Sequence, residues 1–202
     1  MTIIVAEKRF AGEQHDIRDF VTPAQIEVVC LFEQLKSDDP QQTLLNCWTW
    51  VNDNVAYPTD RLGRTVDRQE LISFGALHYI NSTDFWFFPC EVIARARIAR
   101  KYGRKSLGDC DDVAFVLVSV LRNQLSPQDV YCVMGDYFNS QAAGHAWVKC
   151  RLDGAWCIVD PTAKVGTPAD PNRYDEFVLF NDMEVHELKP VEGLLGSIAR
   201  GI

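Results

Sequence analysis

The dipeptide Asp153-Gly154 separates two strand-like segments, 144–152 and 155–160, and it fixes how they can pair. Asp-Gly is favoured in two-residue hairpin turns, whose central residues both take positive φ. With this turn, Trp147 faces Asp160, and His145 becomes a diagonal neighbour of Asp160 on the same face. A slip of one residue would move Asp160 to the opposite face. The turn therefore predicts an antiparallel sheet on which His145, Trp147 and Asp160 lie together with Ile158.

A predicted helix at 110–124 begins with a cysteine in its first turn. Asp109 is a suitable N-cap, with Asp112 at capping-box spacing. Cys110 shares the inward face of the apolar positions, which are Val113, Val116, Leu117, Val120 and Leu121. The free N–H groups and positive dipole at a helix start stabilise a thiolate there. The negative charges of the neighbouring aspartates destabilise a thiolate at Cys110 unless these side chains are paired or point away. A nearby imidazolium would stabilise the thiolate.

The remaining periodicity predicts helices at 22–36, 41–54 and 89–102, and strands near 129–136 and 177–180. Thr22 is expected to cap the first helix, with Pro23 at its first position. A short helix at 67–72 is a further candidate within the ambiguous stretch 59–83. Residues 161–175 contain three prolines and are expected to form a long loop.

Length and charge limit the classes of protein to which the chain can belong. A chain of 202 residues suits a single domain over 1–202, with a core at about 41–163 and extensions on both sides. Its net charge of −8 does not favour binding to nucleic acid or to an anionic membrane. No window approaches the roughly 18 apolar residues of a membrane span. The N-terminus has no signal-peptide core, so we expect a cytoplasmic protein.

The seven cysteines do not form a metal-binding pattern. No Cys-x-x-Cys occurs, so a zinc knuckle is not expected. No acidic cluster stands out as a calcium site either, so we expect neither a metal nor a cofactor. In a reducing compartment most of the seven are expected to be small apolar core residues.

Two segments each allow two interpretations. The aromatic block at 84–89, Asp84-Phe85-Trp86-Phe87-Phe88-Pro89, either fills the core or forms a wall of a substrate cleft. The segment 95–105 carries six cations that could bind phosphate or nucleic acid. Tyr102 is its one aromatic residue for base stacking, so a solvated helix face is favoured, with cations near the helix C-terminus.

Cys110, His145 and Asp160 together supply the parts of a nucleophilic site. The thiol would attack, the imidazole would take its proton, and the carboxylate would orient the imidazole. Each residue alone is more often structural. Here all three residues occur in this chain order, and His145 and Asp160 share one face of the sheet. This combination favours a catalytic role.

These residues stand in three blocks that resemble the motifs of the transglutaminase-like cysteine hydrolases. The blocks are 108–114 (GDCDDVA), 144–148 (GHAWV) and 156–162 (WCIVDPT). The upstream segments 50–57 and 84–89 are similar to those that precede the nucleophile in bacterial transglutaminase-like proteinases. The resemblance covers about 41–163. It implies an α+β fold with a papain-like core, in which the nucleophile helix packs on an antiparallel β-sheet.

The resemblance also implies the roles of the site residues: Cys110 as nucleophile, His145 as base and Asp160 as its orienter. Trp86 is a candidate side-chain donor to the oxyanion, and Trp147 a candidate cleft residue. The activity expected is acyl transfer on a peptide or protein amide through a thioester, with hydrolysis by a protease or amidase preferred. Transamidation to an amine acceptor remains an alternative, as does a non-catalytic peptide-binding or assembly module. The sequence does not define the oligomeric state.

Overall fold

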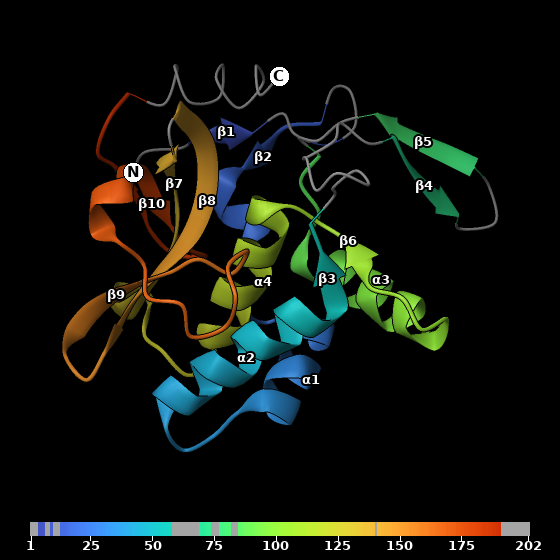
Figure 1. The fold of residues 1–202 in the computed structure, drawn as a ribbon, viewed down its shortest axis with the longest axis horizontal. Coiled ribbons are helices and arrows are strands. Elements are labelled where there is room, and N and C mark those ends of the chain that lie inside the picture. The colour runs from blue at the N-terminus through green and yellow to red at the C-terminus, as the bar shows by residue number, and fades with distance from the viewer. Residues whose placement is uncertain are drawn as a thin grey trace.

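The core of the molecule is an antiparallel sheet with the strand order β11-β10-β7-β8-β9 (Figure 1). The computed structural model describes residues 4–6, 9, 13–57, 69–73, 77–81, 85–139 and 141–190. The strands of this sheet are β7 (Val130–Asn139), β8 (Gln141–Leu152), β9 (Ala155–Val159), β10 (Tyr174–Phe180) and β11 (Val185–Glu187). The short strands elsewhere are β1 (Val5–Ala6), β2 (His15–Asp16), β3 (Val55–Ala56), β4 (Gln69–Ser73), β5 (Leu77–Asn81) and β6 (Ser106–Leu107).

The hairpin between β8 and β9 has the predicted turn and register. Asp153 and Gly154 both have positive φ, at 51° and 79°. Leu152 pairs with Ala155, and the ladder runs without a shift to the pair Val148 and Val159. The next opposed position is Trp147 against Asp160, so the predicted register is confirmed.

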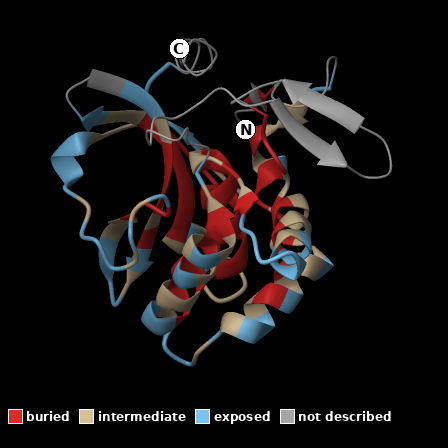
Figure 2. Cartoon of the chain, turned by 45° about the vertical axis from the view of Figure 1, so that its right-hand side comes forward, coloured by how far each residue is buried: buried red, intermediate tan, exposed pale blue. Residues whose placement is uncertain are grey.

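In the described part of the chain, four α-helices pack beside the sheet: α1 (Ile26–Leu35), α2 (Pro40–Asn54), α3 (Pro89–Lys101) and α4 (Cys110–Leu121). Helix α4 is the central one, and every residue from Asp111 to Leu121 is buried (Figure 2). Its apolar side chains form one core with the even-numbered positions of β8, including Ala146 and Val148. Each fully buried Val, Leu or Phe side chain in this core contributes about 1.5–3 kcal/mol to stability. The fold is thus the predicted α+β architecture, with the cysteine-bearing helix against an antiparallel sheet.

Helix α1 starts later than expected. Thr22 and Pro23 lie in a turn before it, and Gln25 takes the N-cap position. The Thr22 backbone N–H donates instead to the Ser119 hydroxyl on α4 at 2.9 Å. Tertiary docking of this segment on α4 therefore overrides the local capping pattern.

Two other expectations on the local structure need correction. Residues 69–73 form strand β4, paired with β5, where a short helix at 67–72 was a candidate. Within the predicted loop 161–175, Pro171–Arg173 form a 3₁₀ turn, and β10 already begins at Tyr174. The extension after residue 190 lies outside the described residues.

The aromatic block fills the core. Phe85, Trp86 and Phe87 are 7%, 1% and 8% exposed. The Trp86 ring meets Phe20 and Phe115 edge-on, with ring centroids 5.0 and 5.3 Å apart. Of the two interpretations of this block, the structure therefore supports the core plug.

A short parallel pair brings two distant segments to the start of α4. Strand β3 ends one residue before Tyr57, and β6 ends three residues before Cys110. The two strands pair in parallel, Val55 with Ser106 and Ala56 with Leu107. Gly108 N–H continues the contact by donating to the Ala56 carbonyl at 3.2 Å. A Cβ at Gly108 would stand 3.0 Å from the Val55 side chain, so glycine permits this close approach.

Candidate active site

Cys110 is the first residue of α4, as predicted, and its side chain is half-buried. Asp109 takes the N-cap position with an extended backbone, φ −105° and ψ −162°. Among the described residues its side chain does not cap the first-turn amides. The sulfur therefore stands at the positive end of the helix dipole, next to N–H groups without helical partners.

His145 and Asp160 form the predicted pair. His145 Nε2 donates to Asp160 Oδ2 at 2.8 Å, and the two side chains are 13% and 11% exposed. The other carboxylate oxygen accepts two hydrogen bonds from Thr162, from its backbone N–H at 3.0 Å and its hydroxyl at 2.6 Å. Burial raises the pKa of Asp160, but the hydrogen bond and charge of His145 and the Thr162 bonds outweigh it and lower the pKa. Asp160 is thus an ionised carboxylate aimed at the imidazole.

The His145 ring also interacts with the Cys110 sulfur. Burial lowers the pKa of His145, yet the charge of Cys110 and hydrogen bonds to Asp160 and Cys110 raise it to about 10. Because Nε2 is engaged by Asp160, Nδ1 is the ring nitrogen left for the thiol. The structure thus brings together all three residues on which the sequence-based hypothesis depends, and it favours an imidazolium beside the sulfur.

Tyr57 is a neighbour of Cys110 that the sequence does not reveal. Tyr57 is 38% exposed, but desolvation of the covered part of its side chain raises its pKa, and the charges of Cys110, Asp109 and Asp111 and a hydrogen bond to Cys110 raise it further. The phenol therefore stays protonated and can donate to the sulfur. Only the β3–β6 pairing places it there, because Tyr57 and Cys110 are far apart in the chain.

The two tryptophans assigned to the site are both buried. Trp86 is 1% exposed and packs among core side chains, so it does not form the wall of a cleft, and its role as an oxyanion donor stays a prediction. Trp147 is 0% exposed, and its indole packs behind the imidazole, with ring centroids 6.1 Å apart. Tyr174 packs on Trp147 at 5.0 Å and donates its hydroxyl to Asp160 Oδ2 at 3.1 Å. Trp147 and Tyr174 thus support the His145–Asp160 pair rather than line a cleft.

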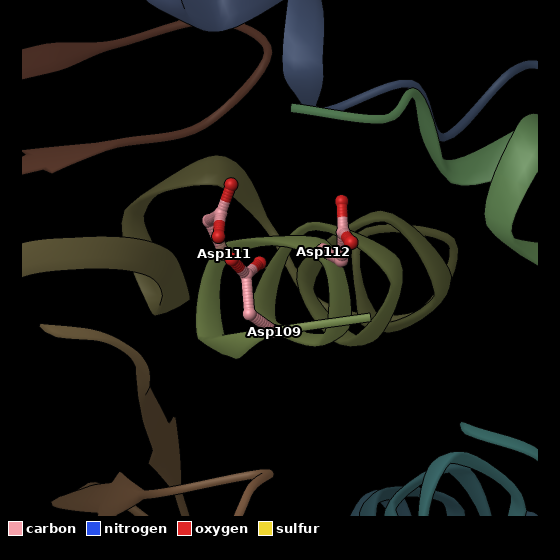
Figure 3. Close-up of side chains that lie close together, drawn as sticks. All are labelled: Asp109, Asp111 and Asp112. Carbon is pink, nitrogen blue, oxygen red and sulfur yellow. The ribbon is translucent and has the colours of Figure 1, made fainter. Parts of the chain in front are cut away.

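Three carboxyl groups gather at the start of α4, on residues that flank Cys110 in the sequence (Figure 3). Oxygens of Asp109, Asp111 and Asp112 lie within 4.8 Å of one another, and Asp111 and Asp112 are buried. Burial, followed by the charge of Asp109, raises the pKa of both buried carboxyls well above the usual value. Asp112 Oδ1 accepts the Phe87 backbone N–H at 3.0 Å. Protonation of the buried carboxyls reduces the like-charge repulsion that the sequence predicts for a thiolate at Cys110.

Comparisons with known proteins agree with this architecture. A family model described as a transglutaminase-like domain matches residues 27–188. Among solved structures, LapG of Legionella pneumophila aligns over 87% of this chain and 86% of its own, with 14% identity and a TM-score of 0.52. Its calcium-bound form aligns over 86% of each chain, with 16% identity and a TM-score of 0.51. At these identities the likeness is one of fold.

No curated protein sequence matches significantly. Among the described residues, no helix is both long and apolar enough to cross a membrane. With most of its length matched by the family model, the chain belongs to the transglutaminase-like family.

Proposed function

We propose that the protein is a cysteine-dependent acyl-transfer enzyme that hydrolyses amide bonds in peptides or proteins. The observation that carries the proposal is the chain of contacts from Cys110 through His145 to Asp160, with the His145–Asp160 bond at 2.8 Å. LapG, a cysteine protease, has the same fold.

The reaction uses this chain of contacts in two stages. The Cys110 thiolate attacks the amide carbonyl, and backbone N–H groups at the start of α4 stabilise the oxyanion. The His145 imidazolium then gives its proton to the leaving amine, and a thioester to Cys110 remains. In the second stage neutral His145 activates water, which releases the acid and restores the thiolate. Asp160 holds the imidazole in one tautomer throughout.

Tyr57 is placed to assist this chemistry. Its raised pKa keeps the hydroxyl a donor, and its hydrogen bond to Cys110 puts that donor at the attacking atom. It is a second candidate side-chain donor beside Trp86.

The sequence alone predicts no metal site, but the cluster of Asp109, Asp111 and Asp112 fits a divalent cation of the calcium class, which prefers carboxylate oxygens. Asp111 Oδ2 is buried without a hydrogen bond from the described residues, and burial, followed by the charge of Asp109, raises the pKa of Asp111 and Asp112. Asp109, Asp111 and Asp112 would hold the ion. It would supply positive charge that neutralises carboxylates next to Cys110.

The test is a library of peptide amides incubated with the full-length protein, alongside a peptide with an electrophilic chloromethyl ketone. We expect covalent labelling of Cys110, located by mass spectrometry, and new carboxyl termini that take up ¹⁸O from labelled water. Incorporation of an added amine in place of ¹⁸O would show transamidation instead. The Cys110→Ala variant is the control, and it should show neither labelling at position 110 nor a product from any peptide. Labelling of other cysteines alone, with no product from any peptide, would refute the proposal.

A further inference from the structure

Two cysteines face each other across the β8–β9 ladder. Cys150 and Cys157 are directly opposed residues, and their Sγ atoms lie 3.3 Å apart. Cys157 Sγ also lies 3.3 Å from the Cys150 carbonyl oxygen, to which it can donate. Both side chains contact the core between the sheet and the helices. The pair therefore lies on the sheet face opposite to Trp147 and Ile158.

The backbone geometry suits a bond between the two sulfurs. Opposed residues of an antiparallel pair have Cα atoms about 4.5–5.5 Å apart, within the range of about 4.4–6.8 Å found in disulfides. An S–S bond of about 2.05 Å requires the sulfurs to approach by a little over 1 Å. Strand β9 is at the edge of the sheet, with β8 as its neighbour there, so a small shift of β9 and side-chain rotation can supply this movement.

The two thiols differ in exposure and in protonation. Cys157 is half-buried, whereas Cys150 is 0% exposed. A hydrogen bond from Cys150 lowers the pKa of Cys157 to about 7, against the opposing effect of burial. The same hydrogen bond, together with burial, raises the pKa of Cys150. The lowered pKa favours the thiolate of Cys157 over that of Cys150, and the thiolate is the form that reacts with peroxides.

We infer that Cys150 and Cys157 form an oxidation-sensitive dithiol, in which a hydroperoxide oxidises Cys157 and Cys150 then closes an intramolecular disulfide. In the first step the Cys157 sulfur attacks a peroxide oxygen, the O–O bond breaks, and a sulfenic acid forms with release of water or an alcohol. In the second step the Cys150 sulfur attacks the Cys157 sulfur, the S–O bond breaks, and water leaves with the Cys150 proton. The two sulfurs together lose two electrons, and the peroxide gains them.

The inference does not depend on the proposed function, because neither thiol belongs to the Cys110–His145–Asp160 group. It can therefore be tested in full-length protein with Cys110→Ala, which removes the candidate nucleophile. The protein is treated with hydrogen peroxide, unfolded in an alkylating agent and digested with trypsin. Cleavage after Lys149, Arg151 and Lys164 leaves Cys150-Arg151 joined to the peptide 152–164 if the disulfide has formed.

We expect two of the six cysteines that remain in Cys110→Ala to lose their reactivity toward the alkylating agent. The linked peptide should appear at the reduced mass less two hydrogen atoms, and dithiothreitol should reverse both changes. Cys157→Ser should abolish the link. Cys150→Ala should leave a sulfenic acid on Cys157 that dimedone traps. Cys30→Ser, at an exposed cysteine, is the matched control and should leave the link unchanged.

The inference is overturned if Cys150 and Cys157 both remain open to alkylation after peroxide treatment while the reduced protein melts cooperatively. It is equally overturned if either sulfur links to a different cysteine. In protein that retains Cys110 and Cys30, a dimedone adduct on one of these two residues and none on Cys157 would also contradict the inference.

Discussion

Asp160 Oδ2 lies 2.8 Å from His145 Nε2, and both oxygens of this carboxylate are held by further donors. The Tyr174 hydroxyl donates to the same oxygen at 3.1 Å, and Thr162 donates twice to the other. A carboxylate bound on all sides keeps one orientation and accepts a proton reluctantly. His145 is therefore held in the tautomer that leaves Nδ1 for the thiol.

Replacing Asp160 with Asn should remove most of the activity. The amide can present an N–H to His145 and stabilise the wrong tautomer, which in serine proteases lowers kcat by about 10⁴-fold. Tyr174→Phe removes one of the four hydrogen bonds to the carboxylate and should cost about tenfold or less. The measurement is the rate of peptide hydrolysis, with the rate of iodoacetamide alkylation at Cys110 as a substrate-independent check. Equal losses in the two variants would contradict the orienting role of Asp160.

The pH dependence should show an alkaline limit set by His145. Its pKa is raised from 6.5 to about 10, so the protonated ring stabilises the fold fully below about pH 6.5. That contribution is lost as the pH rises through about 10. Alkylation of Cys110 and the free energy of unfolding should both change near that pH in the wild type. His145→Ala should show neither change. If alkylation and stability in the wild type instead changed near pH 6.5, Cys110 would not interact with the ring.

Tyr57→Phe should lower kcat/KM by about tenfold or more, because one hydrogen-bond donor at the reacting atom is lost. The isosteric ring keeps the packing, so the melting temperature should change little. Tyr102→Phe is the matched control, since Tyr102 is 76% exposed at the end of α3. An unchanged kcat/KM in Tyr57→Phe would remove this tyrosine from the mechanism.

Asp111→Asn should stabilise the protein at neutral pH in the absence of divalent cations. The folded-state pKa of Asp111 is raised, so the carboxyl favours the folded state at acid pH, and this contribution is lost as the pH rises through that pKa. Each kcal/mol recovered should raise the melting temperature by about 2–4 °C.

Calcium should raise the melting temperature of the wild type and have less effect on Asp111→Asn, because the variant offers one carboxylate fewer. Asp53→Asn, at an exposed position of α2, is the control both for stability without divalent cations and for the calcium response. A calcium response that is the same in all three proteins would place the ion elsewhere.

The sequence determined those features that depend on neighbouring residues. Asp153-Gly154 set the hairpin and its register, and the apolar spacing after Cys110 set the nucleophile helix and its buried face. His145 and Asp160 were predictable because a two-residue turn fixes which positions are opposed. Thr162, two residues after Asp160, could also have been found from local turn chemistry.

Tertiary structure decided what the local pattern does not encode. Tyr57 reaches Cys110 only through the parallel pairing of β3 with β6, between segments about 50 residues apart. Trp86 entered the core because Phe20 and Phe115 enclose it, although its sequence context suited a cleft equally well. The charge state of the aspartates beside Cys110 depends on burial, and burial follows from the packing of α4 against the rest of the chain.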